Sequence, residues 1–102
     1  MDVVSKKLIE LSKLDMGWYW GEGIPTLPEI AARVRKFNEA AKERGWETDI
    51  WPGPEGDILM SFEKMESRYE VSIELDGTLT ISDEGETWKE DVADEGIWEV
   101  IK

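Results

Sequence analysis

The side chains of this sequence that could do chemistry are carboxylates and indoles. Its 102 residues include 24 acidic side chains and six tryptophans, but no cysteine and no histidine. Without cysteine there is no disulfide, no thiol nucleophile and no thiolate metal site. Without histidine, the usual general base near neutral pH and the commonest metal ligand are both missing. No serine lies in a nucleophile motif, and no glycine loop of the phosphate-binding kind precedes a helix. We therefore expect no enzyme and no cofactor.

Two carboxylate arrangements are the alternatives to that expectation. A pair of acids about 5 to 10 Å apart can hydrolyse a bond held between them, which would require a deep pocket containing an acid of strongly raised pKa. Asp49 and the run 52–57 also bring three carboxylates to one turn. Calcium prefers six to eight oxygens from a denser loop, so we expect a rigid turn there and no metal.

The charge is unevenly divided along the chain. The net charge is −12, yet residues 1–46 carry eight bases and seven acids (8 − 7 = +1), whereas residues 47–102 carry four bases and seventeen acids (4 − 17 = −13). This balance excludes direct binding to nucleic acid or anionic lipid, which requires clustered Lys and Arg. No apolar run is long enough to span a membrane. We expect one cytoplasmic domain over residues 1–102, with a near-neutral helical half and an acidic sheet half.

Helical spacing organises the first half. Val4, Leu8 and Leu11 repeat at helical intervals between Asp2 and about residue 14. A second helix is predicted over residues 26–44, with Thr26 and Glu29 as a capping box, Pro28 in the first turn and Gly45 as the stop. Its buried stripe is Ile30, Val34, Phe37 and Ala41.

Period-two alternation organises the second half. It predicts strands over residues 47–51, 57–63 and 69–75 and at Leu79 and Ile81, with hairpin turns at residues 64–67 and at Asp76-Gly77. The expected fold is α+β: two N-terminal helices, then an antiparallel three- to four-stranded β-meander with helix 26–44 packed on one face. Residues 97–101 fit either a strand or a helix. The expected core is Leu8, Leu11, Ile30, Val34, Phe37, Ile58, Met60, Phe62, Val71, Ile73, Leu79 and Ile81.

Several loop and turn motifs resemble those of a family of small uncharacterised bacterial proteins. The similarity covers about residues 14–91, and the family implies no activity, cofactor or ligand that can be transferred to this chain. The sequence departs from the family at Gly56-Asp57, where members often have two glycines and a strand that contains glutamine. The matching segments are Gly17-Trp18, Gly21-Glu22-Gly23, Pro25, Pro28-Glu29, Trp51-Pro52, Pro54-Glu55-Gly56, Tyr69-Glu70-Val71-Ser72-Ile73-Glu74 and Asp76-Gly77.

The acidic surface supports the main functional prediction. Alternation places Asp57, Glu63, Glu70 and Glu74 on the outward sheet face with no base among them, and Lys64 and Arg68 in the adjoining turn. One interpretation is a solvated face that serves solubility. The other is a protein-binding inhibitor that occupies the basic nucleic-acid-binding surface of a partner, like DNA-mimic or anti-CRISPR proteins of phages and mobile elements. The predicted contact residues are Glu63, Glu70, Glu74, Asp83, Glu84, Glu86, Glu90, Asp91, Asp94 and Glu95.

The aromatic loop supports a second prediction. The densest aromatic cluster of the sequence consists of Trp18, Tyr19 and Trp20, and Glu22 lies beside it. Such anchors provide large contact areas at low entropy cost, so the chain would be an antitoxin or immunity-type module that binds a protein through this loop. The alternative is that the two tryptophans fold over the end of the sheet and fill the core.

Overall fold

In a computed structural model of the protein, the described residues are 2–11, 13, 28–53, 57–74, 76–83, 86–89 and 92–101, without the side chains of residues 86–89 and 95. Their order confirms the predicted α+β class. The elements are α1 (Val3–Leu11), α2 (Pro28–Glu43), β1 (Glu47–Pro52), β2 (Ile58–Lys64), β3 (Ser67–Ile73), β4 (Leu79–Asp83), β5 (Glu86–Lys89), the 3₁₀ helix η1 (Asp94–Gly96) and α3 (Ile97–Val100).

Helix α1 begins at a side-chain cap and is attached to α2 by the same residue. The Ser5 amide donates to the Asp2 carboxylate at 2.8 Å, and the Lys6 amide donates to the Asp2 carbonyl at 3.1 Å. Asp2 is therefore the N-cap, which satisfies amides that the first turn leaves unpaired. The other Asp2 carboxylate oxygen accepts from Asn38 at 3.1 Å and pairs with Lys42, both in α2.

Helix α2 ends at Glu43, and Gly45 just beyond it stops the helix as predicted. Gly45 has a φ of 82°, in the left-handed region that favours glycine. The Trp46 amide donates to the Ala41 carbonyl, and the Gly45 amide donates to that of Lys42. This pair of bonds is the Schellman motif, which turns the chain back so that Trp46 is buried and β1 begins at once. The predicted capping box at Thr26 lies outside the described residues.

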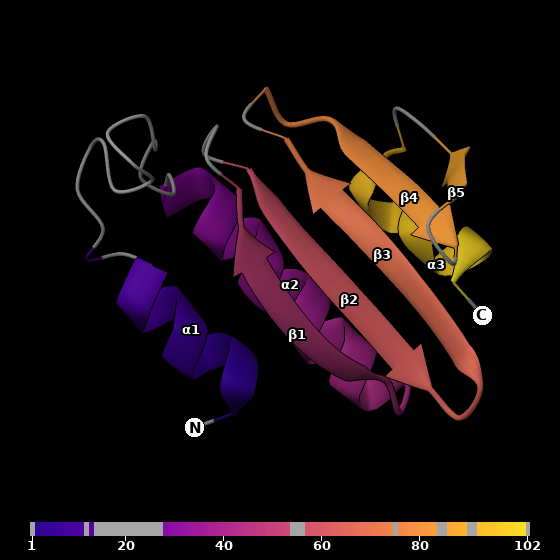
Figure 1. Cartoon of the computed structure of the whole chain (residues 1–102), viewed down its shortest axis with the longest axis horizontal. Helices are drawn as coiled ribbons and strands as arrows, with labels where there is room; N and C mark the ends of the chain where they lie inside the picture. The colour runs from indigo at the N-terminus through magenta and orange to yellow at the C-terminus, as the bar shows by residue number, and fades with distance from the viewer. Residues whose placement is uncertain are drawn as a thin grey trace.

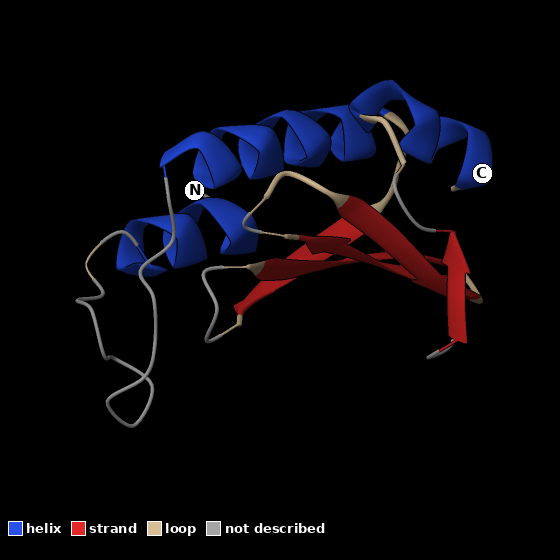
Figure 2. Ribbon diagram, turned by 90° about the horizontal axis from the view of Figure 1, so that it is seen from above, coloured by secondary structure: helices blue, strands red, loops and turns tan. Residues whose placement is uncertain are grey.

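The strands form one antiparallel meander in the order β1-β2-β3-β4-β5 (Figure 1). The short strand β5 adds a fifth member to the three or four predicted, inside a stretch whose charged sequence shows no alternation. Its register shifts between Ile81 and Ser82, so it is an irregular edge. Among the described elements, all helices lie on the same side of the sheet (Figure 2). Within the described part of the chain, no helix is long and apolar enough to cross a membrane.

The core lies between the helices and one sheet face. Every residue that the sequence pattern assigned to the core is buried, because one face of each strand and one stripe of each helix point into this layer. Phe62 is fully buried and packs edge to face on Trp98 of α3, with ring centroids 5.9 Å apart. Residues outside the predicted list that also join the core are Val4, Ala41, Trp46, Ile50, Ile97 and Ile101.

The C-terminal segment is helical rather than extended, which resolves the two alternatives for residues 97–101. Arg33 of α2 anchors it through a two-point contact with Asp94, at 2.5 Å from Nη2 and 3.2 Å from Nε. The same guanidinium donates to the Gly77 carbonyl at 2.8 Å. One side chain thus links α2 to η1 and to the β3–β4 hairpin.

Truncation of Phe62 tests the packing of the core. We expect Phe62→Ala to lower the free energy of unfolding by about 3 to 5 kcal/mol, since it removes a fully buried ring and leaves a cavity beside Trp98. Chemical denaturation measures the change. Val3→Ala is the control, because Val3 is an exposed apolar residue of α1 and its truncation should cost well under 1 kcal/mol. Equal losses in the two variants would contradict this packing.

The β3–β4 hairpin makes a pH-dependent prediction. Hydrogen bonds from the Thr78 side chain and amide hold the pKa of the Asp76 carboxyl below its ordinary value of 3.8. A carboxyl whose pKa is lower in the folded state contributes stability above its unfolded pKa and loses it as pH falls through the folded pKa. In Thr78→Val, the Asp76 carboxyl should titrate at higher pH by NMR, with no such shift in Thr80→Val. An unchanged Asp76 titration would contradict the assignment of the hydroxyl hydrogen bond.

Candidate functional site

The sheet face opposite the helices is covered by no element that the structure describes (Figure 2). We call it the open face. Alternation along the strands and the cross-strand register define its members, since paired residues point to the same side. They are Glu47, Asp49 and Trp51 of β1, Leu59, Ser61 and Glu63 of β2, Arg68, Glu70 and Ser72 of β3, Thr80 and Ser82 of β4, and Glu74 just after β3.

Short hydroxyl side chains surround Glu70 in the middle of the open face. Ser61 lies opposite Glu70, which lies opposite Ser82, and Ser72 lies opposite Thr80. These hydroxyl residues are buried or half-buried by their neighbours, although the structure places no other layer over them. Short side chains project little from a sheet, so another molecule can approach the backbone closely between the charged residues.

Carboxylates exceed cations on this face. Arg68 pairs with Glu63, which lies directly opposite it, and reaches Glu70 at 3.5 Å. Glu74 accepts a hydrogen bond from the Ser72 hydroxyl at 2.9 Å. Glu47 has no ion pair with any residue that the structure describes.

Lys7 of α1 supplies the second cation by reaching past the edge of β1. Its ammonium lies 2.6 Å from Asp49 Oδ1, 3.2 Å from the Ile50 carbonyl and 5.0 Å from the centre of the Trp51 ring. The Ile50 amide donates to the same Asp49 oxygen at 2.8 Å. These contacts occupy the backbone groups of Ile50, which protects this part of the edge strand from pairing with another chain.

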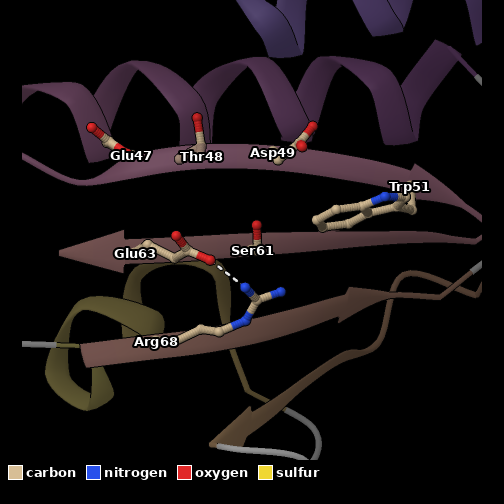
Figure 3. A pocket seen from close by; sticks show the side chains of 7 residues that line it. All are labelled: Glu47, Thr48, Asp49, Trp51, Ser61, Glu63 and Arg68. Atoms are coloured by element: carbon tan, nitrogen blue, oxygen red, sulfur yellow. Dashed lines mark hydrogen bonds and ion pairs between the residues drawn. The ribbon is translucent and has the colours of Figure 1, made fainter. Parts of the chain in front are cut away.

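A shallow pocket of about 290 Å³ opens on the β1 side of the open face, lined by Glu47, Thr48, Asp49, Trp51, Ser61, Glu63 and Arg68. Figure 3 shows the Ser61 hydroxyl between the Trp51 ring and the Glu63 carboxylate, with Asp49 opposite it on β1. Thr48 turns away, because its hydroxyl donates to Asn38 on the helix side at 2.5 Å.

The structure brings three of the predicted contact residues together on the open face, namely Glu63, Glu70 and Glu74. One part of the prediction for this face is wrong: Arg68 lies in β3 and not in the turn, so the face does contain a base. The turn itself is short, with Lys64 opposite Ser67 and Met65 at a φ of 55°.

Two other predicted residues lie on the opposite side of the sheet. Asp83 is opposite Tyr69, on the face of Val71 and Ile81, and Asp94 is paired with Arg33 of α2. Glu86 and Glu95 are placed only by their backbones, in β5 and η1. The remaining predicted residues lie outside the described part of the chain: Glu84, Glu90, Asp91, and Trp18, Tyr19, Trp20 and Glu22 of the aromatic loop.

Sequence reasoning did not assign Glu47, Asp49, Trp51 and Ser61 to this face. The alternation of Glu47, Asp49 and Trp51 with the buried Ile50 contains that signal. The sequence contains no comparable signal for Ser61, because a serine between Met60 and Phe62 is typical of any half-exposed strand. Its position in the pocket depends on the pairing of β1 with β2.

Comparison of the chain with protein-family models, with curated proteins and with solved structures found no match. The kinship that the loop and turn motifs suggest therefore stays a prediction. The functional argument depends on the geometry of the open face alone.

Two tryptophans test the distinction between the open face and the core. Trp51 is 40% exposed on the open face, whereas Trp46 is 5% exposed and packs edge to face on Tyr69. We expect Trp46→Ala to lower the free energy of unfolding by about 3 kcal/mol or more, and Trp51→Ala by about 1 kcal/mol, mainly through its contact with Lys7. Denaturant titration of both variants provides the comparison. A larger loss for Trp51→Ala would show that this ring serves the fold.

Proposed function

We propose that this chain is a non-enzymatic binding module whose open face docks on a basic surface of a partner protein. The observation that carries the proposal is the imbalance of charge on that face. Five described carboxylates share it with two cations, Lys7 and Arg68. Like charges on one face destabilise the compact state, so folding alone does not account for them.

The shape of the open face supports the same proposal. Helices cover only the other side of the sheet, and the centre of the open face has short side chains that do not obstruct a partner. A face with a net negative charge steers a partner of the opposite sign and suppresses wrong partners. The basic surface that we propose is one that also binds nucleic acid, so that docking excludes the polynucleotide as a DNA mimic does.

Matched charge variants test the proposal. In the open-face variant Glu47, Glu63, Glu70 and Glu74 become Gln, and in the helix-side control Glu10, Glu29, Glu39 and Glu43 become Gln. Each set changes the net charge from −12 to −8, and the control residues are exposed on α1 and α2. The two variants therefore differ in where the charge is lost and not in how much.

Each variant is immobilised and used to capture proteins from an extract of the source cell at 50 and 300 mM salt. We expect the parent and the control to retain a nucleic-acid-binding protein that nucleic acid displaces, and the open-face variant to bind it at least about tenfold more weakly. Capture should also weaken at high salt, where the screening length falls below ~10 Å. Equal binding by both variants would contradict the proposal, and loss on Trp18→Ala or Tyr19→Ala would then point to the aromatic loop.

The acids of the stretch 83–95 form a separate arm of the test. If this stretch contributes to the same surface, reversing Glu86, Glu90, Asp91 and Glu95 to Lys should abolish capture, because four like charges would then face a basic partner. If this variant captured the partner as tightly as the parent, the stretch 83–95 would not belong to the proposed interface, which would then consist of the open face alone.

A further inference from the structure

The pocket beside Trp51 contains hydrogen-bond acceptors that the fold leaves unused. Ser61 is only 3% exposed, and its hydroxyl makes no hydrogen bond to any residue that the structure describes. The described residues contain no fully buried side-chain oxygen that lacks a partner, so the Ser61 hydroxyl is accessible from the pocket that it lines. Figure 3 shows this hydroxyl directed into the pocket between the two strands. Glu47 at the same pocket is the carboxylate without an ion pair among the described residues.

The four residues that carry the nearest acceptors have their Cα atoms at the corners of a small rectangle. Glu47 is opposite Glu63 and Asp49 is opposite Ser61 in the β1–β2 register. The Cα atoms of paired residues are about 5 Å apart and those of alternate residues on one strand about 7 Å apart, so these four side chains begin close enough to reach one small cationic group. Trp51 closes one end of the pocket and Arg68 the other.

An ammonium already lies against this wall of the pocket. Lys7 Nζ is 2.6 Å from Asp49 Oδ1 and 5.0 Å from the centre of the Trp51 ring. Attraction between a cation and the indole face is strongest for tryptophan among the aromatic residues. The contact shows that this indole and carboxylate hold a lysine ammonium, while Asp49 Oδ2 has no partner among the described residues.

We propose that this pocket receives the side-chain ammonium of a lysine from the partner protein, bound by Glu47, Asp49 Oδ2 and the Ser61 hydroxyl and closed by the Trp51 ring. The inference deepens the proposed function and rests on it, because the partner supplies the lysine. An ammonium has three donors for these three acceptors. In the described part of the chain, no group of three carboxylates converges closely enough to hold a metal ion.

The experiment uses a defined probe, a capped Gly-Lys-Gly-Lys-Gly-Lys-Gly peptide, titrated into the ¹⁵N-labelled full chain. We expect saturable NMR shifts of the Ser61 amide and the Trp51 indole N–H. The same peptide with acetylated lysines should cause none, because acetylation removes the charge. Calcium chloride at equal ionic strength serves as the metal control. If calcium saturates the same signals more tightly than the peptide, the pocket is a cation site of another kind and the lysine assignment is overturned.

Variants locate the contact within the pocket. We expect Glu47→Gln to weaken peptide binding about fivefold and Ser61→Ala about threefold, each the loss of a single partly exposed hydrogen bond to a charged group. Glu39→Gln on the exposed side of α2 is the matched control and should bind like the parent. Ser61→Ala should be about as stable as the parent, since the hydroxyl that it removes bonds no described residue and is accessible from the pocket. If Ser61 served only the structure, Ser61→Ala would instead be less stable than the parent and would bind the peptide as tightly.

The outcomes separate the two proposals. If Glu70→Gln and Glu74→Gln weaken peptide binding while Glu47→Gln, Ser61→Ala and Trp51→Phe do not, the open face binds basic partners and the lysine pocket is wrong. If the peptide shifts no open-face signal at any concentration, the pocket and the proposed function both fail.

Discussion

The architecture of this protein depends on the burial of one sheet face only. Every described helix packs on the same side of the meander, and the apolar residues that alternate along four strands are buried or half-buried there. Because side chains alternate along a strand, burying one set forces the other set outward. Residues on the second face therefore do not have to be apolar or to fit the packing of the core. The second face consists of carboxylates, small hydroxyls, one exposed indole, Leu59 and Arg68.

Three-dimensional packing partly reverses the separation of charge along the chain. The acidic second half receives Lys7 on Asp49 and Arg33 on Asp94, and both cations come from the near-neutral first half. Lys7 also occupies the carbonyl of Ile50 and contacts Trp51, so it fixes α1 against the edge of the sheet. After these pairings Glu47 and Glu74 are the open-face carboxylates without an ion pair among the described residues, and the face still has more carboxylates than cations.

Local patterns predicted the fold and the core, because period-two alternation and helical stripes report burial directly. The stop at Gly45 followed from the need for a left-handed residue, which the Schellman bonds confirm. Contacts between distant residues were not predictable in this way. The pairing of Asp94 with Arg33 moves one acid to the helix side, and the β1–β2 register places Ser61 beside Asp49. Strand β5 was missed because its four residues do not alternate and its register is irregular.

The central claim is that the open face, and not the helical side, contacts the partner. Carboxylate footprinting of the complex with the captured partner tests it most directly, since the described acids of both sides are labelled in one experiment. We expect Glu63, Glu70 and Glu74 to become protected from labelling while Glu29 and Glu39 of α2 react as in the free protein. Protection of the α2 acids with full reactivity on the open face would contradict it.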